Sequence, residues 1–200
     1  MTTEIPPVES PAPVLLLGDP LLRTVSAPVT DFKAPAFELG RGRLQATLAD
    51  FRRKHGFGRA ISAPQIGIAR RFIAMDLGDG PRLIVNPVVT WSSRERLTMW
   101  DDCMSFPSLL VRLERHRSIS LRFQDETGAY HEWERLDLAT SELLQHELDH
   151  LDGVLAVDRA LDRESIVMRE VFDAQRLRFV AMVDYVIGGA DAPAASSGSP

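Results

Sequence analysis

Two histidines four residues apart are the part of this sequence best suited to chemistry. They lie in the stretch "QHELDH", residues 145–150, where Glu147 directly follows His146 and precedes His150 by three positions. Residues four apart share one face of an α-helix, so His146 and His150 project side by side with Glu147 next to them. Two such imidazoles can hold a divalent cation, and the carboxylate can act as a general base. The pattern therefore predicts a catalytic metal site.

A third ligand must come from elsewhere, because a catalytic cation takes about three protein ligands and keeps one position open for water. The extended zincin pattern HExxHxxGxxH would supply a histidine, but Ala156 stands at its last position. Glu164 or Glu170 would supply a carboxylate, as in proteases that use a downstream acid. Cys103 is the only cysteine of the chain, and its thiolate would suit two imidazoles. The residue types leave these ligands open and favour Cys103.

The surrounding sequence predicts the helices that would position this site. Residues 139–153 are typical of the histidine-bearing helix, ended by a glycine. Residues 37–56 have apolar side chains at helical spacing and also end in glycine, which predicts an amphipathic helix near the N-terminus. Residues 161–189 predict a C-terminal helix with Asp162 as its N-cap.

Short apolar segments between the first two helices predict strands. The segments at 70–77, 81–89 and 95–100 are separated by Gly, Pro, Asn and Ser. Residues 111–123 alternate in part between apolar and polar types, and the segment beyond Gly128 would complete a hairpin with them. Helix, strands, helix and helix in this order predict an α+β architecture.

Composition indicates an ordinary globular protein with one domain. The chain has 200 residues, 44% of them hydrophobic and 26% charged, which is enough for one sizeable core. The net charge of −5 and the scattered arginines argue against nucleic acid as a partner. No basic leader or bilayer-length apolar run is present, so we expect a cytoplasmic protein without membrane contact. We expect residues 14–187 to form the domain, and the polar, Pro- and Gly-containing residues 1–13 and 188–200 to be disordered tails.

Three segments resemble, in the same order, the motifs of the peptide deformylase family. "GRAISAPQIG" at 58–67 resembles the first motif, GxGxAAPQxG, "DDCMS" at 101–105 the second, EGCLS, and "QHELDH" the third. The resemblance implies an α+β fold with mixed and antiparallel β-sheets around a central HExxH helix, an N-terminal amphipathic helix and a C-terminal helix. It also implies an activity, removal of the formyl group from N-formylmethionine at the start of nascent bacterial polypeptides as they emerge from the ribosome.

The same resemblance assigns the metal chemistry. Cys103, His146 and His150 correspond to the ligands of one divalent cation, with water in the fourth position. Fe²⁺ is the ion expected in the cell, and Zn²⁺, Ni²⁺ or Co²⁺ can occupy such a site in preparations. The cation would activate the water that attacks the formyl carbon, while Glu147 takes up the proton and later delivers it to the leaving amine.

The resemblance further implies how the substrate is held. The side-chain amide of Gln65 and the backbone N–H of Met104 correspond to donors for the oxyanion. The segment Gly58, Arg59 and Ala60 corresponds to an edge along which an extended peptide pairs as an added strand.

The helix itself adds two candidates for substrate binding. Glu142 and Leu143 lie one turn before His146, so they are expected to face the metal side and to line the substrate pocket. A carboxylate there is poorly suited to an apolar thioether unless it is paired, and Arg59 is a possible partner. The alternative is a Glu142 that faces solvent in the first turn of the helix. Asp149, between the histidines, is expected to accept a hydrogen bond from a ligand or from an arginine.

The sequence departs from the family motifs without removing a ligand or the base, and the second motif reads DDCMS where the family has EGCLS. Three of the departures change the residue type most. They are Ala60 and Ser62 in the first motif and Asp102, which replaces a glycine beside Cys103. Two other classes of protein therefore stay open. One is a zincin-type metallopeptidase or amidase that uses Glu164 or Glu170 instead of the cysteine. The other is a non-catalytic metal-binding protein whose fourth ligand is a further residue such as His116 or His131.

Overall fold

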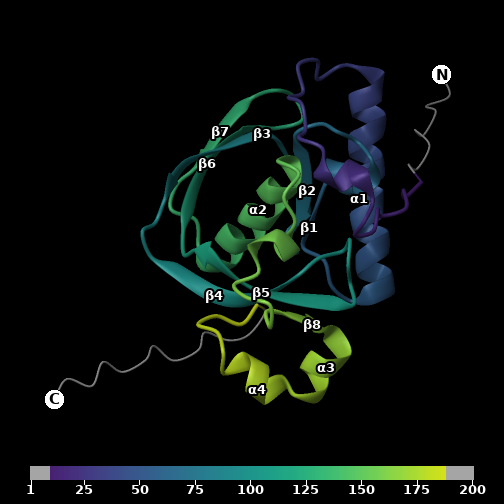
Figure 1. The fold of residues 1–200 in the computed structure, drawn as a ribbon. Coiled ribbons are helices and arrows are strands. Elements are labelled where there is room, and N and C mark those ends of the chain that lie inside the picture. The colour runs from purple at the N-terminus through teal and green to yellow at the C-terminus, as the bar shows by residue number, and fades with distance from the viewer. Residues whose placement is uncertain (1–9, 188–200) are drawn as a thin grey trace.

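The structure, a computed structural model, describes residues 10–187. It has two antiparallel β-sheets with helix α2 (Leu138–Leu151) between them and helix α1 (Pro35–His55) on the outside (Figure 1). The tails expected at 1–9 and 188–200 lie outside the described residues. Residues 10–13, which composition assigned to the N-terminal tail, are described, and Ala12 is buried where its N–H donates to Thr47 Oγ1 at 2.9 Å. This short segment is held by a hydrogen bond to α1 that composition alone does not reveal.

The larger sheet has five strands in the order β1-β2-β3-β6-β7, and every pair in it is antiparallel. Its strands are β1 Ala60–Ser62, β2 Phe72–Asp76, β3 Pro81–Ser92, β6 Ile119–Gln124 and β7 Tyr130–Trp133. The smaller sheet has three antiparallel strands in the order β4-β5-β8, namely β4 Arg96–Asp102, β5 Leu109–His116 and β8 Ile166–Met168.

Helix α1, Pro35–His55, confirms the amphipathic helix expected near the N-terminus. Proline occupies its first position, where the missing N–H has no partner to lose. Gly56 ends the helix in the left-handed region at φ 75°, which glycine adopts without the steric cost of a Cβ. Its apolar face packs against the larger sheet through Phe37, Leu44, Leu48 and Phe51.

Helix α2, Leu138–Leu151, carries both histidines of the HExxH pattern. Asp137 is its N-cap, because its Oδ1 accepts the N–H of Thr140 at 2.9 Å. Ten of its fourteen residues are buried, so nearly the whole helix is enclosed instead of one face alone. Leu144, Leu148 and Leu151 pack against strands of the five-stranded sheet. The histidine face turns instead toward Cys103 and Asp101 at the end of β4.

The predicted strand region 111–123 consists of two strands in different sheets. Strand β5 ends at His116 and pairs with β4, whereas β6 begins at Ile119 and pairs with β3. The chain therefore crosses from one sheet to the other at residues 117–118, a change of partner that alternation alone does not reveal. The hairpin expected around Gly128 is formed by β6 and β7.

The C-terminal region differs from the single helix expected over 161–189. Asp162 caps a turn, since its Oδ1 accepts the N–H of Glu164 at 2.9 Å and the hydroxyl of Ser165. Strand β8 follows and covers the edge of β5, which satisfies backbone groups that a helix would have left open. The helical part is split into α3 Arg169–Ala174 and α4 Arg176–Val180. The expected α+β class with antiparallel sheets and a helical C-terminal region is otherwise confirmed.

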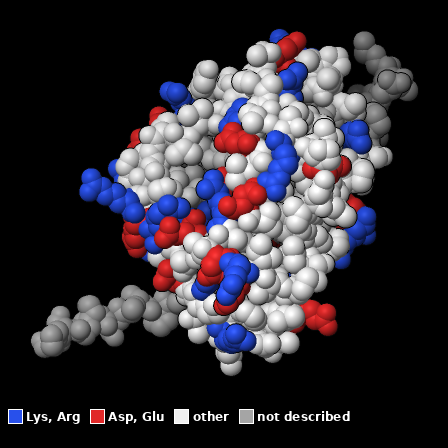
Figure 2. Space-filling view, viewed as in Figure 1, with Lys and Arg blue, Asp and Glu red and all other residues white. Residues whose placement is uncertain are grey.

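The surface shows mixed charge. Acidic and basic side chains are interspersed on the face seen in Figure 2, and no broad basic patch gathers there. Within the described part of the chain, no helix combines the length and the apolar character needed to cross a membrane.

Candidate metal centre

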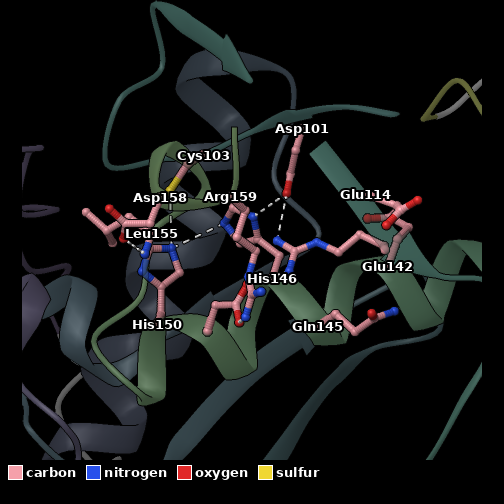
Figure 3. A network of polar contacts seen from close by, with 12 residues as sticks. Asp101, Cys103, Glu114, Glu142, Gln145, His146, His150, Leu155, Asp158 and Arg159 are labelled. Carbon is pink, nitrogen blue, oxygen red and sulfur yellow. Dashed lines mark hydrogen bonds and ion pairs between the residues drawn. The ribbon is translucent and has the colours of Figure 1, made fainter. Parts of the chain in front are cut away.

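Three buried side chains converge where α2 meets the end of β4. Sγ of Cys103 lies 3.2 Å from Nε2 of His150, which lies 3.2 Å from Nε2 of His146 (Figure 3). All three atoms lie within 4.8 Å of one another. We call these residues the Cys-His-His cluster.

The donor set of this cluster fits a divalent cation. Two ring nitrogens and one sulfur lie close enough to share one cation, and thiolate and imidazole are the ligands that first-row transition metals and zinc prefer. In the described residues, Nδ1 of His150 is buried without a hydrogen-bond partner, so no such bond sets the orientation of that ring. The cluster therefore has the chemistry of a three-ligand metal site.

A second set of polar contacts orients His146. Its Nδ1 lies 3.0 Å from Oδ2 of Asp101, which also accepts from Arg115 at 3.0 Å (Figure 3). Contact with this carboxylate leaves the other ring nitrogen to face the cluster. Burial would raise the pKa of Asp101, but His146 and Arg115 outweigh burial and hold that pKa well below its ordinary value. Asp101 is therefore an ionised partner for the ring.

Asp149, which lies between the two histidines on the same helix, contacts two arginines. It accepts hydrogen bonds from Arg115 and from Nε of Arg159, the latter at 2.6 Å. Arg115 has only 3% of its side chain exposed and bridges Asp149 to Asp101. The expected hydrogen bond from an arginine to Asp149 is thus present. A network of paired charges, most of it buried, lies next to the cluster.

Glu147 is buried beside the cluster and contacts Ser62. The hydroxyl of Ser62 donates to Oε2 of Glu147 and lies 2.9 Å from its backbone oxygen. Burial raises the pKa of Glu147, and His146 and Ser62 oppose that rise only in part. Ser62 stood out in the sequence only as a departure from the motif, so its contact with Glu147 could not be foreseen from its residue type.

Gln65 turns its amide toward the cluster. Its Oε1 accepts the N–H of Ser62 at 2.9 Å, and this bond fixes which end of the amide points inward. Nε2 lies 3.7 Å from Sγ of Cys103 and 3.3 Å from the hydroxyl of Ser105. The amide is thus a buried donor next to the candidate metal ligands.

A cavity of about 620 Å³ opens beside the cluster. All site residues predicted from the sequence except His150 line it: Gly58, Arg59, Ala60, Gln65, Cys103, Met104, Glu142, Leu143, His146 and Glu147. Gly58 has φ +113°, which L side chains rarely adopt, and a Cβ there would lie 2.5 Å from Cε of Met104. One concave site therefore brings together segments that are far apart in the chain.

Glu142 points into this cavity and not into solvent. Its side chain is 2% exposed, and Oε1 lies 2.6 Å from Nη2 of Arg59. The solvent-facing alternative is therefore wrong, because Leu138–Leu151 is enclosed at this turn and Arg59 supplies the partner. Tyr185 and Ile187 also line the cavity, and no motif or spacing in the sequence pointed to them.

The other ligands that the sequence left open lie away from the cluster. Glu164 and Glu170 are exposed in the C-terminal region. Nδ1 of His116 lies 2.6 Å from the backbone oxygen of Ser93, and His131 pairs with Asp125 at 2.7 Å. None of these four residues lies close enough to the histidines to ligate the same cation. The structure therefore does not support the zincin-type site or the four-ligand site.

Comparison with known proteins gives one consistent family. The family model described as polypeptide deformylase matches residues 11–165. A peptide deformylase from Thermotoga neapolitana is 36% identical over 157 residues, which cover 78% of this chain and 92% of that protein.

Solved structures agree in fold. The crystal structure of peptide deformylase from Thermotoga maritima has a TM-score of 0.68 and 35% identity, covering 76% of this chain and 99% of the other. A peptide deformylase from Synechococcus elongatus, in complex with actinonin, has a TM-score of 0.71 and 26% identity, covering 83% and 86%. The extent of the match, together with a Cys-His-His cluster beside a buried glutamate, leads to one conclusion: this chain belongs to the peptide deformylase family, whose members are hydrolases that remove an N-formyl group.

Proposed function

We propose that this protein releases formate from formylmethionine at the amino terminus of nascent polypeptides, with Glu147 as general base and acid. The observation that carries the proposal is the position of Glu147, which is buried next to the Cys-His-His cluster in the wall of one cavity. Amide hydrolysis at a metal site requires a general base, three protein ligands for the cation and a cavity that admits the end of a peptide.

Cys103, His146 and His150 would hold one divalent cation, and Fe²⁺ is the ion we propose for the cell. When bound, such a cation supplies Lewis acidity and lowers the pKa of the water that it binds. Asp101 keeps the ring of His146 in the orientation that ligation needs, since it contacts the opposite ring nitrogen.

Glu147 moves the proton. Its carboxylate takes a proton from the attacking water and later gives it to the amine nitrogen as the C–N bond breaks, so that formate and a free amino terminus result. The hydrogen bond from Ser62 holds one carboxylate oxygen, which fixes the direction in which the group faces the cavity. The pKa of Glu147, raised by burial, brings this base closer to neutral pH than an ordinary carboxyl.

The side-chain amide of Gln65 and the backbone N–H of Met104 would donate hydrogen bonds to the formyl oxygen as negative charge develops on it. Nε2 of Gln65 lies within 3.7 Å of the thiol of Cys103, and the backbone N–H of Met104 follows the same ligand in the chain. Donors fixed at the place where charge develops stabilise the transition state more than the ground state.

The peptide would lie along Gly58, Arg59 and Ala60. These residues line the cavity at the start of β1, an edge strand of the five-stranded sheet, which can accept an added strand. The relative from Synechococcus elongatus was solved in complex with actinonin, which supports the proposal that this chain also binds a ligand. We place the reaction in the cytoplasm, where formylated chains emerge from the ribosome.

The proposal is tested by measuring formate release from a formyl-Met peptide after anaerobic purification and loading with Fe²⁺, with the acetyl-Met peptide as control substrate. We expect formate from the formyl peptide and a loss of both bound cation and activity in Cys103→Ala. His131→Ala, at a surface histidine outside the cluster, is the matched control and should keep both. A parent protein that binds the cation and still releases no formate would overturn the proposal.

A further inference from the structure

One wall of the cavity carries an ion pair where an apolar side-chain pocket would need apolar residues. Arg59 donates to Oε1 of Glu142 at 2.6 Å and to the backbone oxygen of Ala139 at 3.0 Å. Glu142 is almost fully buried, and one third of the Arg59 side chain is exposed. Both line the same cavity as the Cys-His-His cluster.

The position of this pair along α2 decides which part of a substrate it meets. Glu142 lies one helical turn before His146, and Ala139 lies nearly one turn earlier still, so the cavity runs from the cluster along the helix toward its N-terminus. In a formyl peptide the α-carbon of the first residue is bonded to the formylated nitrogen. With the formyl group at the cluster, the first side chain is therefore the group that lies closest to Arg59 and Glu142.

The C-terminal segment completes this wall. Tyr185 and Ile187 line the cavity, although they lie beyond residue 165, where the match to the family ends. Tyr185 is placed by a parallel bridge to Met99 of β4 and by its N–H, which donates to the backbone oxygen of Thr98 at 3.1 Å. It lines the same cavity as Arg59 and Glu142. A phenol thus joins the arginine and the glutamate at one side of the cavity.

Three carboxylates that line the cavity are already paired with arginines. Asp102 pairs with Arg169 at 2.7 Å, Asp101 pairs with Arg115, and Glu142 pairs with Arg59. A charged substrate side chain would therefore enter without a counter-ion. A thioether would cover the exposed part of the Arg59 guanidinium without offering it a strong hydrogen-bond acceptor in place of water, which is unfavourable.

An uncharged side chain that both donates and accepts hydrogen bonds meets neither penalty. Burial raises the pKa of Glu142 to about 7 although Arg59 lowers it, so near neutral pH the carboxyl can accept from such a side chain or donate to it. Sites that hydrogen-bond a polar substrate group discriminate strongly against analogues that lack this group, because buried polar atoms are then left unpaired.

We propose that Arg59, Glu142 and Tyr185 are specificity-determining residues that extend the substrate range to formyl peptides with an uncharged hydrogen-bonding first side chain, which are hydrolysed at least as well as formyl-Met peptides. This inference rests on the deformylase activity proposed above. It concerns which amino terminus is accepted, and leaves the roles of the cluster and Glu147 unchanged.

The test compares formyl-Gln and formyl-Met peptides of otherwise identical sequence, because both first side chains are unbranched and only glutamine offers an amide. A formyl-Glu peptide serves as the charged comparison. We expect kcat/KM of the parent to be at least equal for Gln and Met and to be lower for Glu. The double variant Arg59→Leu with Glu142→Leu removes both partners together, so no unpaired charge is left in the wall. We expect it to lower the Gln-to-Met ratio on the order of tenfold or more.

A matched control replaces another Arg–Glu pair by the same residues. Arg96 and Glu114 pair across β4 and β5 at 3.0 Å, and neither lines the cavity, so Arg96→Leu with Glu114→Leu should leave the Gln-to-Met ratio unchanged. Tyr185→Phe removes only the hydroxyl and should lower the ratio in the same direction as the cavity double variant.

The parent ratio decides the proposal even if the cavity double variant fails to fold. A parent whose kcat/KM for the Met peptide exceeds that for the Gln peptide by more than about twofold would overturn it, as would a Gln-to-Met ratio that both cavity variants leave within about twofold of the parent. Absence of formate from all three peptides would instead count against the proposed function, so the two failures are distinguishable.

Discussion

Asp101 and Arg115 show how residues outside the Cys-His-His cluster determine what the cluster can do. Arg115 holds Asp101, and Asp101 contacts the ring nitrogen of His146 that faces away from the cluster. The same arginine also bonds Asp149, which Arg159 holds from the other side. The histidine is thereby held by a chain of paired and buried charges, and removal of any one member would leave another charge buried without its partner.

Replacement of Glu147 by glutamine should abolish most turnover and keep the cation. Glutamine preserves the size of the side chain and cannot take up a proton, and a positioned acid/base contributes on the order of a hundredfold or more. Formate release should fall by at least that factor in Glu147→Gln, with cation content measured in the same sample. Glu164→Gln, at an exposed acid, should match the parent. Turnover equal to the parent in Glu147→Gln would exclude Glu147 as the base.

Glu142 should make stability depend on pH in a direction opposite to that of a typical salt-bridged acid. Its pKa is raised from 4.5 to about 7 by burial, so the folded state favours the protonated form. The resulting contribution to stability is present below the unfolded pKa and is lost as pH rises through the folded pKa. Glutamine resembles the protonated acid and does not ionise. As pH rises from 4.5 to about 7, the free energy of unfolding should therefore fall less in Glu142→Gln than in the parent.

The measurement is urea unfolding of the parent and of Glu142→Gln at about pH 5 and about pH 8, with equal cation content. The variant should gain stability relative to the parent at the higher pH. Glu114→Gln, at a half-exposed acid, is the control substitution. An identical stability difference between parent and Glu142→Gln at both pH values would show that Glu142 does not titrate as inferred.

At the scale of elements, α2 both packs in the core and carries the two histidines of the cluster. Its leucines face the five-stranded sheet, while His146 and His150 face the end of β4. Because the helix is enclosed between the sheets, its rotation and its position along its axis are set by contacts on both sides. The two imidazoles are thus held by a rigid element and meet Cys103 from a fixed direction.

The N-cap of α2 should contribute measurably to this rigidity. Both oxygens of Asp137 accept from Thr140, one from its backbone N–H and one from its hydroxyl. Asp137→Ala should lower the free energy of unfolding by ~1 kcal/mol, the usual effect of losing an N-cap. Urea unfolding would measure the loss, and Asp79→Ala, in an exposed ion pair, should change stability by less than ~0.5 kcal/mol. Equal effects of the two substitutions would argue against the cap.

At the scale of the whole molecule, the cavity exists because distant segments meet. Gly58–Ala60 and Gln65 come from the first sheet and its following turn, Asp101–Met104 from the second sheet, and Glu142–Glu147 from α2. The returning C-terminal segment adds Tyr185 and Ile187. The cluster lies at one end of this cavity, so a ligand of suitable length can reach the cation and the polar wall together.

Actinonin should therefore inhibit this protein, as expected from the complex of a relative that is 26% identical. A simple formyl-mimicking hydroxamate, which can chelate a cation through two oxygens, should inhibit as well and should compete with the formyl peptide. Inhibition constants measured with the parent and with Arg59→Leu plus Glu142→Leu would separate chelation from side-chain contacts. Full activity with either compound at ~1 mM would argue against an open cation position, since even binding of about −4 kcal/mol would be detected.

Local regularities in the sequence determined several features of this protein. The spacing of His146, Glu147 and His150 depends only on helical periodicity, so their shared position on one helix followed from four-residue spacing. The extent of α1 and its glycine stop also followed from local pattern. The three motifs indicated the family because their residue types and order are specific.

Only the tertiary structure decided what these local features meet. Residue types left Cys103 competing with Glu164 and Glu170, and the fold brings the cysteine to the histidines while both acids stay exposed. The crossing between sheets at residues 117–118 and the return of Tyr185 to β4 depend on pairings between strands far apart in the chain. Such pairings are selected by the packing of the whole core, which periodicity within one segment does not encode.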